Sequence, residues 1–339
     1  MRDITAVLEA LQASRLRCTY NALSALYGVT MPQLFSALGE KRPLASWVVN
    51  ARTLQPTGYG QSQEHPDLYR HSQVLTQPEE IRDLLQRAHT GPEGGSPGGC
   101  ADTTRYFGVD GCRGGWFYVC LADGKLSGGT VSRVEGLLEK ATLADVVFVD
   151  IPIGLREASP GGRQCDTEAR RLLGPRASSV FNAPIRGILR LPDYQEANTT
   201  SRQLTGKGIS KQTWNICGKI LEVDAVMRAD PKARRIIREV HPELCFYGLA
   251  NGRPMAHNKK VQAGFDQRLE IIESHLPGAR DFIDSALAHY PRNIVAADDI
   301  LDATVAAITA SLGSHWQTLP KQPELDCEGL PMEMVYCQR

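Results

Sequence analysis

Acidic residues in three segments of the chain are its strongest sign of chemistry. The segment ADDILDATVAAI carries Asp299 and Asp302, which are three residues apart and would share one face of a helix. Two earlier apolar segments each carry one more acid: YFGVDGCRGGWFYVC carries Asp110 and ADVVFVDIPIGL carries Asp150. Hard divalent cations such as Mg²⁺ or Mn²⁺ bind clusters of carboxylate oxygens. The four aspartates therefore predict a metal site if the fold brings them together.

Some of these acids also have a purely structural explanation. Asp110 precedes a glycine, and Asp-Gly is a common turn dipeptide. Asp298 and Asp299 begin the expected helix, where acids cap free N–H groups and interact favourably with the helix dipole. Asp150 ends an apolar run and Asp302 lies one turn inside the helix, so local structure explains these two less easily.

Two further segments carry polar side chains that could join such a site. In EVHPE, Glu239, His241 and Glu243 alternate and would share one face of a strand that continued to Pro242. They would add a metal ligand, Glu239, and a general acid or base. The alternative is a strand end that faces solvent.

The stretch LTGKGISKQTWN suggests contacts to phosphate groups. Its glycines let backbone N–H groups approach an anion, and its polar side chains add charge and hydrogen bonds. It lacks the spacing of a P-loop, and an exposed loop before a helix is the alternative. The candidate substrate-binding residues are Lys207, Ser210, Lys211 and Gln212.

The elements that must position these residues follow an α/β pattern. Apolar, β-favouring runs predict strands at residues 106–109, 116–121, 126–131 and 146–151. Helical periodicity returns at residues 134–141, 166–173, 211–227, 269–275, 282–289 and 300–312. This order predicts a mixed sheet covered by helices, within a domain of residues 105–339.

The N-terminal part of the chain has a different pattern. Residues 3–14, 20–27, 32–38 and 78–88 have helical spacing, with a short turn between the second and third helices. Residues 45–60 contain a β-favouring core and turn residues, which suggests a hairpin or wing. A linker rich in glycine and proline, residues 89–104, separates this small, mainly helical domain, residues 1–88, from the rest.

Composition excludes several classes of protein. Lysine plus arginine and aspartate plus glutamate both total 38 of 339 residues, so no global basic field marks a nucleic-acid binder. Nine cysteines without C-x-x-C pairs, and no signal segment, indicate reduced thiols in the cytoplasm. No apolar stretch approaches the ~18 residues that span a bilayer, so we expect no membrane partner.

The larger domain resembles a family of unknown function classed as predicted nucleases with an RNase H-like fold. The resemblance covers residues 105–313 and rests on the ordered strings GVDGCRGGW, VDIPIGL, RxCDxxAR, RASSVFNAP, TGKGISKQ, EVHPELCF and DDILDA. It implies that Asp110 on the first strand and Asp150 at the end of the fourth strand bind metal. Asp299 and Asp302 match the D-x-x-D spacing that junction-resolving members use on a C-terminal helix.

The activity implied by this resemblance is hydrolysis of DNA or RNA by a two-metal mechanism. Two Mg²⁺ or Mn²⁺ ions about 3.5 to 4 Å apart activate the attacking water and stabilise the leaving oxygen, and anionic ligands must hold both. Two other classes remain open. One is a non-catalytic nucleic-acid-binding regulator or scaffold, and the other is a phosphotransferase of the actin-like fold.

The N-terminal domain is similar in layout to the winged helix-turn-helix domain of alkyltransferase-like proteins. The segment Ser46-Trp47-Val48-Val49 stands where the related transferases carry a nucleophilic cysteine, which argues against alkyl transfer. A helix in a DNA groove would offer side chains to phosphates or bases, namely Gln33, Ser36, Lys41 and Arg42. A protein-interaction module is the alternative role.

Overall fold

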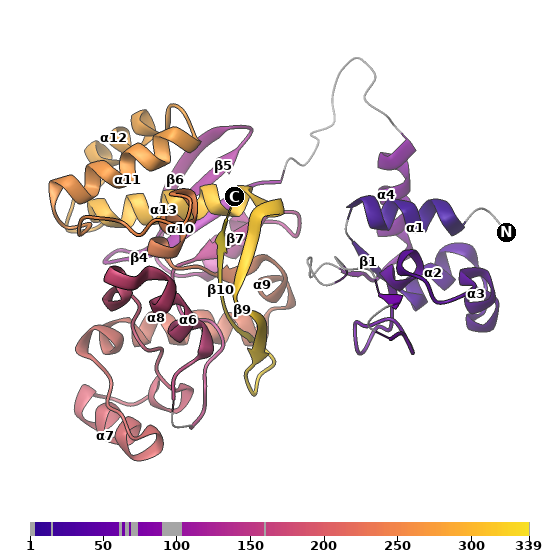
Figure 1. Ribbon diagram of the computed structural model, residues 1–339, viewed down its shortest axis with the longest axis horizontal. Coiled ribbons are helices and arrows are strands. Elements are labelled where there is room, and N and C mark those ends of the chain that lie inside the picture. Colours follow the sequence, from indigo (N-terminus) through magenta and orange to yellow (C-terminus); the bar gives the residue numbers. More distant parts are fainter. Residues whose placement is uncertain are drawn as a thin grey trace. The chain divides into compact units, whose positions relative to one another are not determined.

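The chain forms two compact units, one within residues 1–99 and one within residues 100–339 (Figure 1). The structure, a computed structural model, describes residues 4–14, 16–60, 63–64, 68, 74–89, 104–158 and 161–338. Most of the expected linker, residues 90–103, lies outside the described residues.

The N-terminal unit contains the four helices expected from the sequence. They are α1 (Ile4–Ser14), α2 (Tyr20–Tyr27), α3 (Met31–Leu38) and α4 (Pro78–His89). The α2 helix begins where the Thr19 side chain accepts a hydrogen bond from the Ala22 N–H at 3.2 Å, and it ends at Gly28, whose φ of 62° is left-handed. The short turn between α2 and α3 is therefore confirmed.

The expected wing hairpin is not formed. Instead, β1 (Arg17–Thr19) lies between β2 (Val48–Val49) and β3 (Val74–Leu75) and is parallel to both. Val48 and Val49 are fully buried, which a strand in a solvent-exposed wing would not achieve. After β2 the chain closes a tight turn, in which Leu54 N–H donates to the Asn50 carbonyl at 2.8 Å.

A five-stranded mixed sheet forms the centre of the C-terminal unit. Its strands are β4 (Tyr106–Cys112), β5 (Gly115–Ala122), β6 (Lys125–Val131), β7 (Val146–Val149) and β8 (Ile237–Glu239), in the order β6-β5-β4-β7-β8. β5 is antiparallel to both of its neighbours, β4 and β6, whereas β7 runs parallel to β4 and β8 runs parallel to β7. The expectation of a mixed sheet is confirmed.

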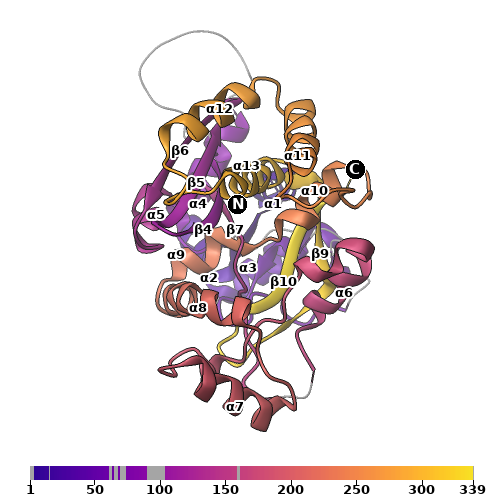
Figure 2. The same cartoon turned by 90° about the vertical axis from the view of Figure 1, so that its left-hand side faces the viewer.

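Helices cover both faces of this sheet (Figure 2). Along β5, Phe117 and Val119 face one layer while Trp116 and Cys120 face the other, as the two-residue repeat of a strand requires. The first layer contains α10 (Pro242–Leu249), α11 (Gln262–His275), α12 (Ala279–His289) and α13 (Ala297–Ser311). The second contains α5 (Glu135–Lys140), α8 (Lys211–Ala229) and α9 (Pro231–Ile236).

Three further elements complete the unit. They are α6 (Gln164–Leu173), α7 (Tyr194–Thr205) and a hairpin of β9 (Trp316–Leu325) and β10 (Pro331–Cys337). A single bridge between Val240 and Val335 joins the hairpin to the segment after β8. Short 3-10 turns lie at Pro43–Trp47, Gly174–Ser179, Arg186–Ile188 and Gly313–His315. None of the described helices combines the length and apolar character needed to cross a membrane.

Gly108 allows a close contact between a helix and the sheet. A Cβ atom on Gly108 would lie 2.0 Å from the Ala303 carbonyl oxygen and 2.3 Å from the Ala307 nitrogen, both in the α13 backbone. Backbone cannot move aside as a side chain can, so any larger residue at position 108 must push α13 away from β4. The position of α13 over the sheet thus depends on this glycine.

We predict that Gly108→Ala lowers the free energy of unfolding by about 3 kcal/mol or more, because the added methyl overlaps the α13 backbone. Chemical denaturation measures the effect. Gly218→Ala is the matched control, because nothing lies within 4 Å of a Cβ at this exposed position of α8. The control should be neutral or slightly stabilising. Equal stability of the two variants would contradict this account of the packing.

Candidate metal centre

Three aspartates from separate elements meet at one end of the sheet. Val109 of β4 pairs with Val149 of β7 in parallel register, so the next residues, Asp110 and Asp150, emerge side by side. The Asp150 N–H donates to the Val109 carbonyl at 2.9 Å and extends this ladder. Because α13 packs closely on β4 at Gly108, Asp302 reaches the same point from the helix.

The three carboxylates are close enough to bind one ion. Asp110, Asp150 and Asp302 each offer an oxygen, and these atoms all lie within 4.8 Å of one another. They line a cavity of about 530 Å³. Asp302 is 1 % exposed, and its Oδ1 has no hydrogen-bond partner among the described residues. A buried, unpartnered carboxylate oxygen is costly unless a ligand satisfies it, so the donor set fits a divalent cation.

The electrostatics of the cluster favour the same conclusion. Burial raises the pKa of Asp150 to about 8, and the charge of Asp302 adds to the rise. Burial also raises the pKa of Asp110 well above its usual value, with Asp150 and Asp302 contributing. With a pKa of about 8, Asp150 holds its proton at neutral pH. A bound divalent cation would relieve the repulsion and displace that proton.

Lys259 is the functional candidate that the sequence did not reveal. Its ammonium pairs with Asp302 and lies 3.5 Å from Asp298. Burial alone would lower the pKa of Lys259, but Asp302 and Asp110 outweigh burial and hold the pKa well above its usual value. The cluster thus contains one built-in positive charge. In the sequence, nothing distinguishes Lys259 from Lys260, because its partner lies 43 residues further on.

Asp299, expected as a ligand, has a helix-capping role in this structure. Its Oδ2 accepts a hydrogen bond from the Ala296 N–H at 2.8 Å, at the start of α13. Burial raises its pKa to about 6, and the Ala296 N–H opposes the rise. Asp298 lines the cavity instead, although the sequence suggested only a cap for it.

Glu239 lines the cavity, but its two oxygens are occupied. Arg163 donates to Oε1 at 2.7 Å and to Oε2 at 2.7 Å, and the Ile153 N–H donates to Oε2 at 2.6 Å. Arg163 also binds Asp166 at 2.6 Å, so the three charged groups form a buried network. The geometry gives Glu239 a role in holding the loop after β7, in place of the expected metal ligation.

His241 and Glu243 also line the cavity, but the expected strand does not continue through them. The β8 strand ends at Glu239 and α10 begins at Pro242, because proline fits the first turn of a helix. His241 Nε2 lies 3.2 Å from the Ser179 carbonyl oxygen, and burial lowers the pKa of its ring. Glu243 pairs with the buried Arg268, and its Oε2 has no partner in the described part of the chain.

The predicted phosphate-contacting residues lie in four different places. Gln212 lines the metal cavity. Lys207 and Ser210 line a second, smaller cavity beside it. Lys211 lines neither of the two and lies over the Tyr194 ring, 5.7 Å from its centroid. Lys41 and Arg42 are exposed in the N-terminal unit, where the Lys41 ammonium donates to the Gly58 carbonyl.

A comparison with family models matches residues 108–324 to the family described as "Protein of unknown function (DUF429)". The chain belongs to this family. The DUF429 match contains Asp110, Asp150, Lys259 and Asp302, so the whole cluster lies in the family's part of the chain. The N-terminal unit lies outside the match. No curated protein and no solved structure matches the chain.

We predict that Asp150→Asn stabilises the metal-free protein increasingly as the pH rises from 5 to 8. An unfolded aspartate has a pKa of about 3.9, whereas burial raises that of Asp150 to about 8. Protonated Asp150 therefore stabilises the folded state at low pH, and this contribution is lost as the pH rises through about 8. Thermal unfolding in EDTA measures the difference in Tm between variant and wild type. A difference that is constant or shrinks with pH would contradict the account.

We also predict that Lys259→Met tightens Mn²⁺ binding by about tenfold, since it removes a positive charge from the ligand cluster. Titration calorimetry gives the affinity and the number of ions bound. Lys260→Met is the control, because Lys260 lines the same cavity without an ion pair to the cluster among the described residues. Unchanged affinity in Lys259→Met, or an equal gain in the control, would show that Lys259 does not compete with the ion.

Proposed function

We propose that this DUF429 protein is a divalent-metal-dependent nuclease whose C-terminal unit has an RNase H-like fold. The observation that carries the proposal is the convergence of Asp110, Asp150 and Asp302 in one cavity. Asp110 lies on the first strand of the sheet and Asp150 directly follows the fourth, β7, in chain order. Asp302 comes from a helix near the C-terminus. This distribution agrees with what the sequence resemblance implies.

The charges around the cavity suit a phosphodiester substrate. Arg176, Lys219 and Lys260 line it, and none of them has a carboxylate partner within the described ranges. Arg176 Nε donates to the Met255 carbonyl at 2.8 Å, and the Lys219 ammonium lies 4.6 Å from the centroid of the Trp116 ring. These cations would attract a polyanion to the cavity, and a metal ion bound by the acids would offset their negative charge.

Asp110, Asp150 and Asp302 would hold Mg²⁺ or Mn²⁺. Such an ion activates the attacking water and stabilises the leaving oxygen when phosphodiesters are cleaved. Lys259, already paired with Asp302, keeps a positive charge beside the acids and would contact a phosphate oxygen.

His241 is the residue best suited to accept a proton. The Ser179 carbonyl can only accept a hydrogen bond, so His241 Nε2 carries the ring proton. Nδ1 is then an acceptor, and it has no partner among the described residues. Because burial lowers the pKa, the ring stays neutral and can take a proton at Nδ1.

One observation favours a non-catalytic, nucleic-acid-binding role as the second candidate. The Lys259 ammonium already neutralises part of the acidic cluster from within the chain. In that case the acids would stabilise the fold around Lys259, and the surrounding cations would bind nucleic acid without cleaving it. For the N-terminal unit we propose recognition of nucleic acid or of a protein partner, with Lys41 and Arg42 exposed for either role.

We predict that the wild-type protein cleaves nucleic acid in Mg²⁺ or Mn²⁺ but not in EDTA, and that Asp150→Asn abolishes cleavage while the fold is kept. Labelled single-stranded, duplex and branched DNA and RNA are the substrates. Asp284→Asn is the control, because Asp284 is exposed on α12 and does not line the metal cavity. Full activity of Asp150→Asn would refute the metal assignment. Intact substrates in every condition, with binding retained, would favour the non-catalytic role.

A further inference from the structure

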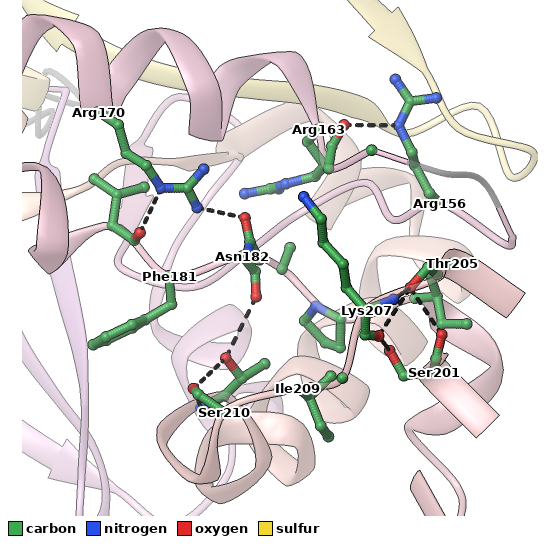
Figure 3. A pocket seen from close by; sticks show the side chains of 18 residues that line it. Arg156, Arg163, Arg170, Phe181, Asn182, Ser201, Thr205, Lys207, Ile209 and Ser210 are labelled. Atoms are coloured by element: carbon green, nitrogen blue, oxygen red, sulfur yellow. Dashed lines mark hydrogen bonds between the residues drawn. The ribbon is translucent and has the colours of Figure 1, made fainter. Parts of the chain in front are cut away.

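A second cavity, of about 250 Å³ (Figure 3), shares a wall with the metal cavity. Arg163, Val180, Phe181, Asn182, Ala183 and Pro184 line both cavities. A ligand long enough to pass over this wall would therefore touch both sites. The smaller cavity lies between the start of α6, the loop after α7 and the first turn of α8.

The lining of the smaller cavity is strongly cationic. It contains Arg156, Arg163, Arg170 and Lys207, and none of its lining residues is acidic. Asp166 and Glu239 neutralise Arg163, and Glu324 pairs with Arg156 at 2.5 Å. Two positive charges remain without a carboxylate partner in the described part of the chain, those of Arg170 and Lys207.

Neutral groups hold Arg170 in place. Its Nε donates to the Val180 carbonyl at 2.9 Å and its Nη2 to Asn182 Oδ1 at 2.7 Å. The guanidinium is thus oriented while its charge stays uncompensated. A fixed guanidinium with free N–H groups is suited to the oxygens of a phosphate.

The loop that carries Lys207 is also fixed. Ser201 and Thr205 hydroxyls donate to the Lys207 carbonyl at 2.8 and 3.0 Å. A Cβ on Gly208 would lie 2.1 Å from Asn198 Oδ1, so a larger residue would displace this side chain, which accepts a hydrogen bond from the Ile209 N–H of the loop at 3.0 Å. The Lys207 side chain extends into the cavity toward Arg163 and Asn182 (Figure 3).

The first turn of α8 adds positive potential to the same cavity. Ser210 caps this 19-residue helix by accepting from the Thr213 N–H at 3.0 Å, and both residues line the cavity. The N-terminus of a helix carries partial positive charge that favours anions. It supplements Arg170 and Lys207, which supply the full charges.

We infer that this cavity binds a phosphate group of a single-stranded nucleic acid that also reaches the metal centre across the shared wall. Phe181, on the shared wall, is 41 % exposed and offers its ring to an unpaired base. The inference rests on the proposed function for the identity of the ligand. The assignment of an anion-binding pocket depends only on its own cations, Arg170 and Lys207.

Binding in EDTA tests the inference without cleavage. The probes are fluorescein-labelled single-stranded and duplex DNA and RNA, measured by anisotropy over a range of salt concentrations. For Arg170→Met/Lys207→Met we expect about tenfold weaker single-strand binding. We also expect a salt slope smaller by about 0.7, the value for one lost phosphate contact. Phe181→Leu should weaken single-strand binding and leave duplex binding unchanged.

The matched control is Arg171→Met/Lys321→Met, which removes the same charge from exposed positions outside both cavities. Equal losses in the control, or no change in the pocket variant, would overturn the inference. Lys207→Met alone should weaken single-strand binding by part of the loss seen in the double variant. Because the Lys207 side chain is exposed, this substitution leaves folding intact. Inorganic phosphate should compete with the oligonucleotide for the wild type and compete less for the pocket variant.

The outcomes separate this inference from the proposed nuclease. Pocket-dependent binding with no cleavage in any metal would support the pocket and refute the nuclease. Metal-dependent cleavage, with oligonucleotide binding that is unchanged in Arg170→Met/Lys207→Met, would refute the phosphate pocket and leave the nuclease proposal standing. Competition by inorganic phosphate that depends on Arg170, without oligonucleotide binding, would overturn the assignment to nucleic acid.

Discussion

The contact between α13 and β4 at Gly108 determines where the acidic residues of this protein lie. The α13 backbone comes so close to β4 that a Cβ on Gly108 would overlap it. This contact places Asp302 beside Asp110, and the parallel pairing of β4 with β7 adds Asp150. Three acids that are far apart in the sequence become one cluster through two backbone contacts. Neither contact depends on the acids themselves.

Such a cluster of buried acids destabilises the folded state. Protonation and a neighbouring positive charge reduce this destabilisation. Burial and mutual repulsion raise the pKa values of Asp110 and Asp150, so protonation removes part of the charge. Lys259 neutralises another part through Asp302. A bound divalent cation would do the same more completely. Groups that destabilise a fold without ligand are typical of sites selected for binding or chemistry.

The local pattern of the sequence predicted four strands of the central sheet and the helices α5, α6, α8, α11, α12 and α13, but not α7, α9, α10 or the β9-β10 hairpin. Of the four aspartates proposed as ligands, three lie in the cluster. Asp110 and Asp150 lie within or directly after apolar strands, and Asp302 lies inside a helix, where an acid needs a partner. Lys259 could not be predicted, because its partner Asp302 approaches only in the folded chain. Glu239 was taken for a ligand for the same reason, since its partner Arg163 lies 76 residues away. The wing was wrong because periodicity does not reveal whether strands pair in parallel or antiparallel fashion.

The central claim is that Asp110, Asp150 and Asp302 together hold a divalent cation. Anomalous diffraction from crystals grown with Mn²⁺, with Asp150→Asn crystals as the comparison, tests it most directly. The account predicts an anomalous peak between the three carboxylates in the wild type and a much weaker peak, or none, in the variant. A wild-type map without a peak there, with Lys259 still paired to Asp302, would contradict the account.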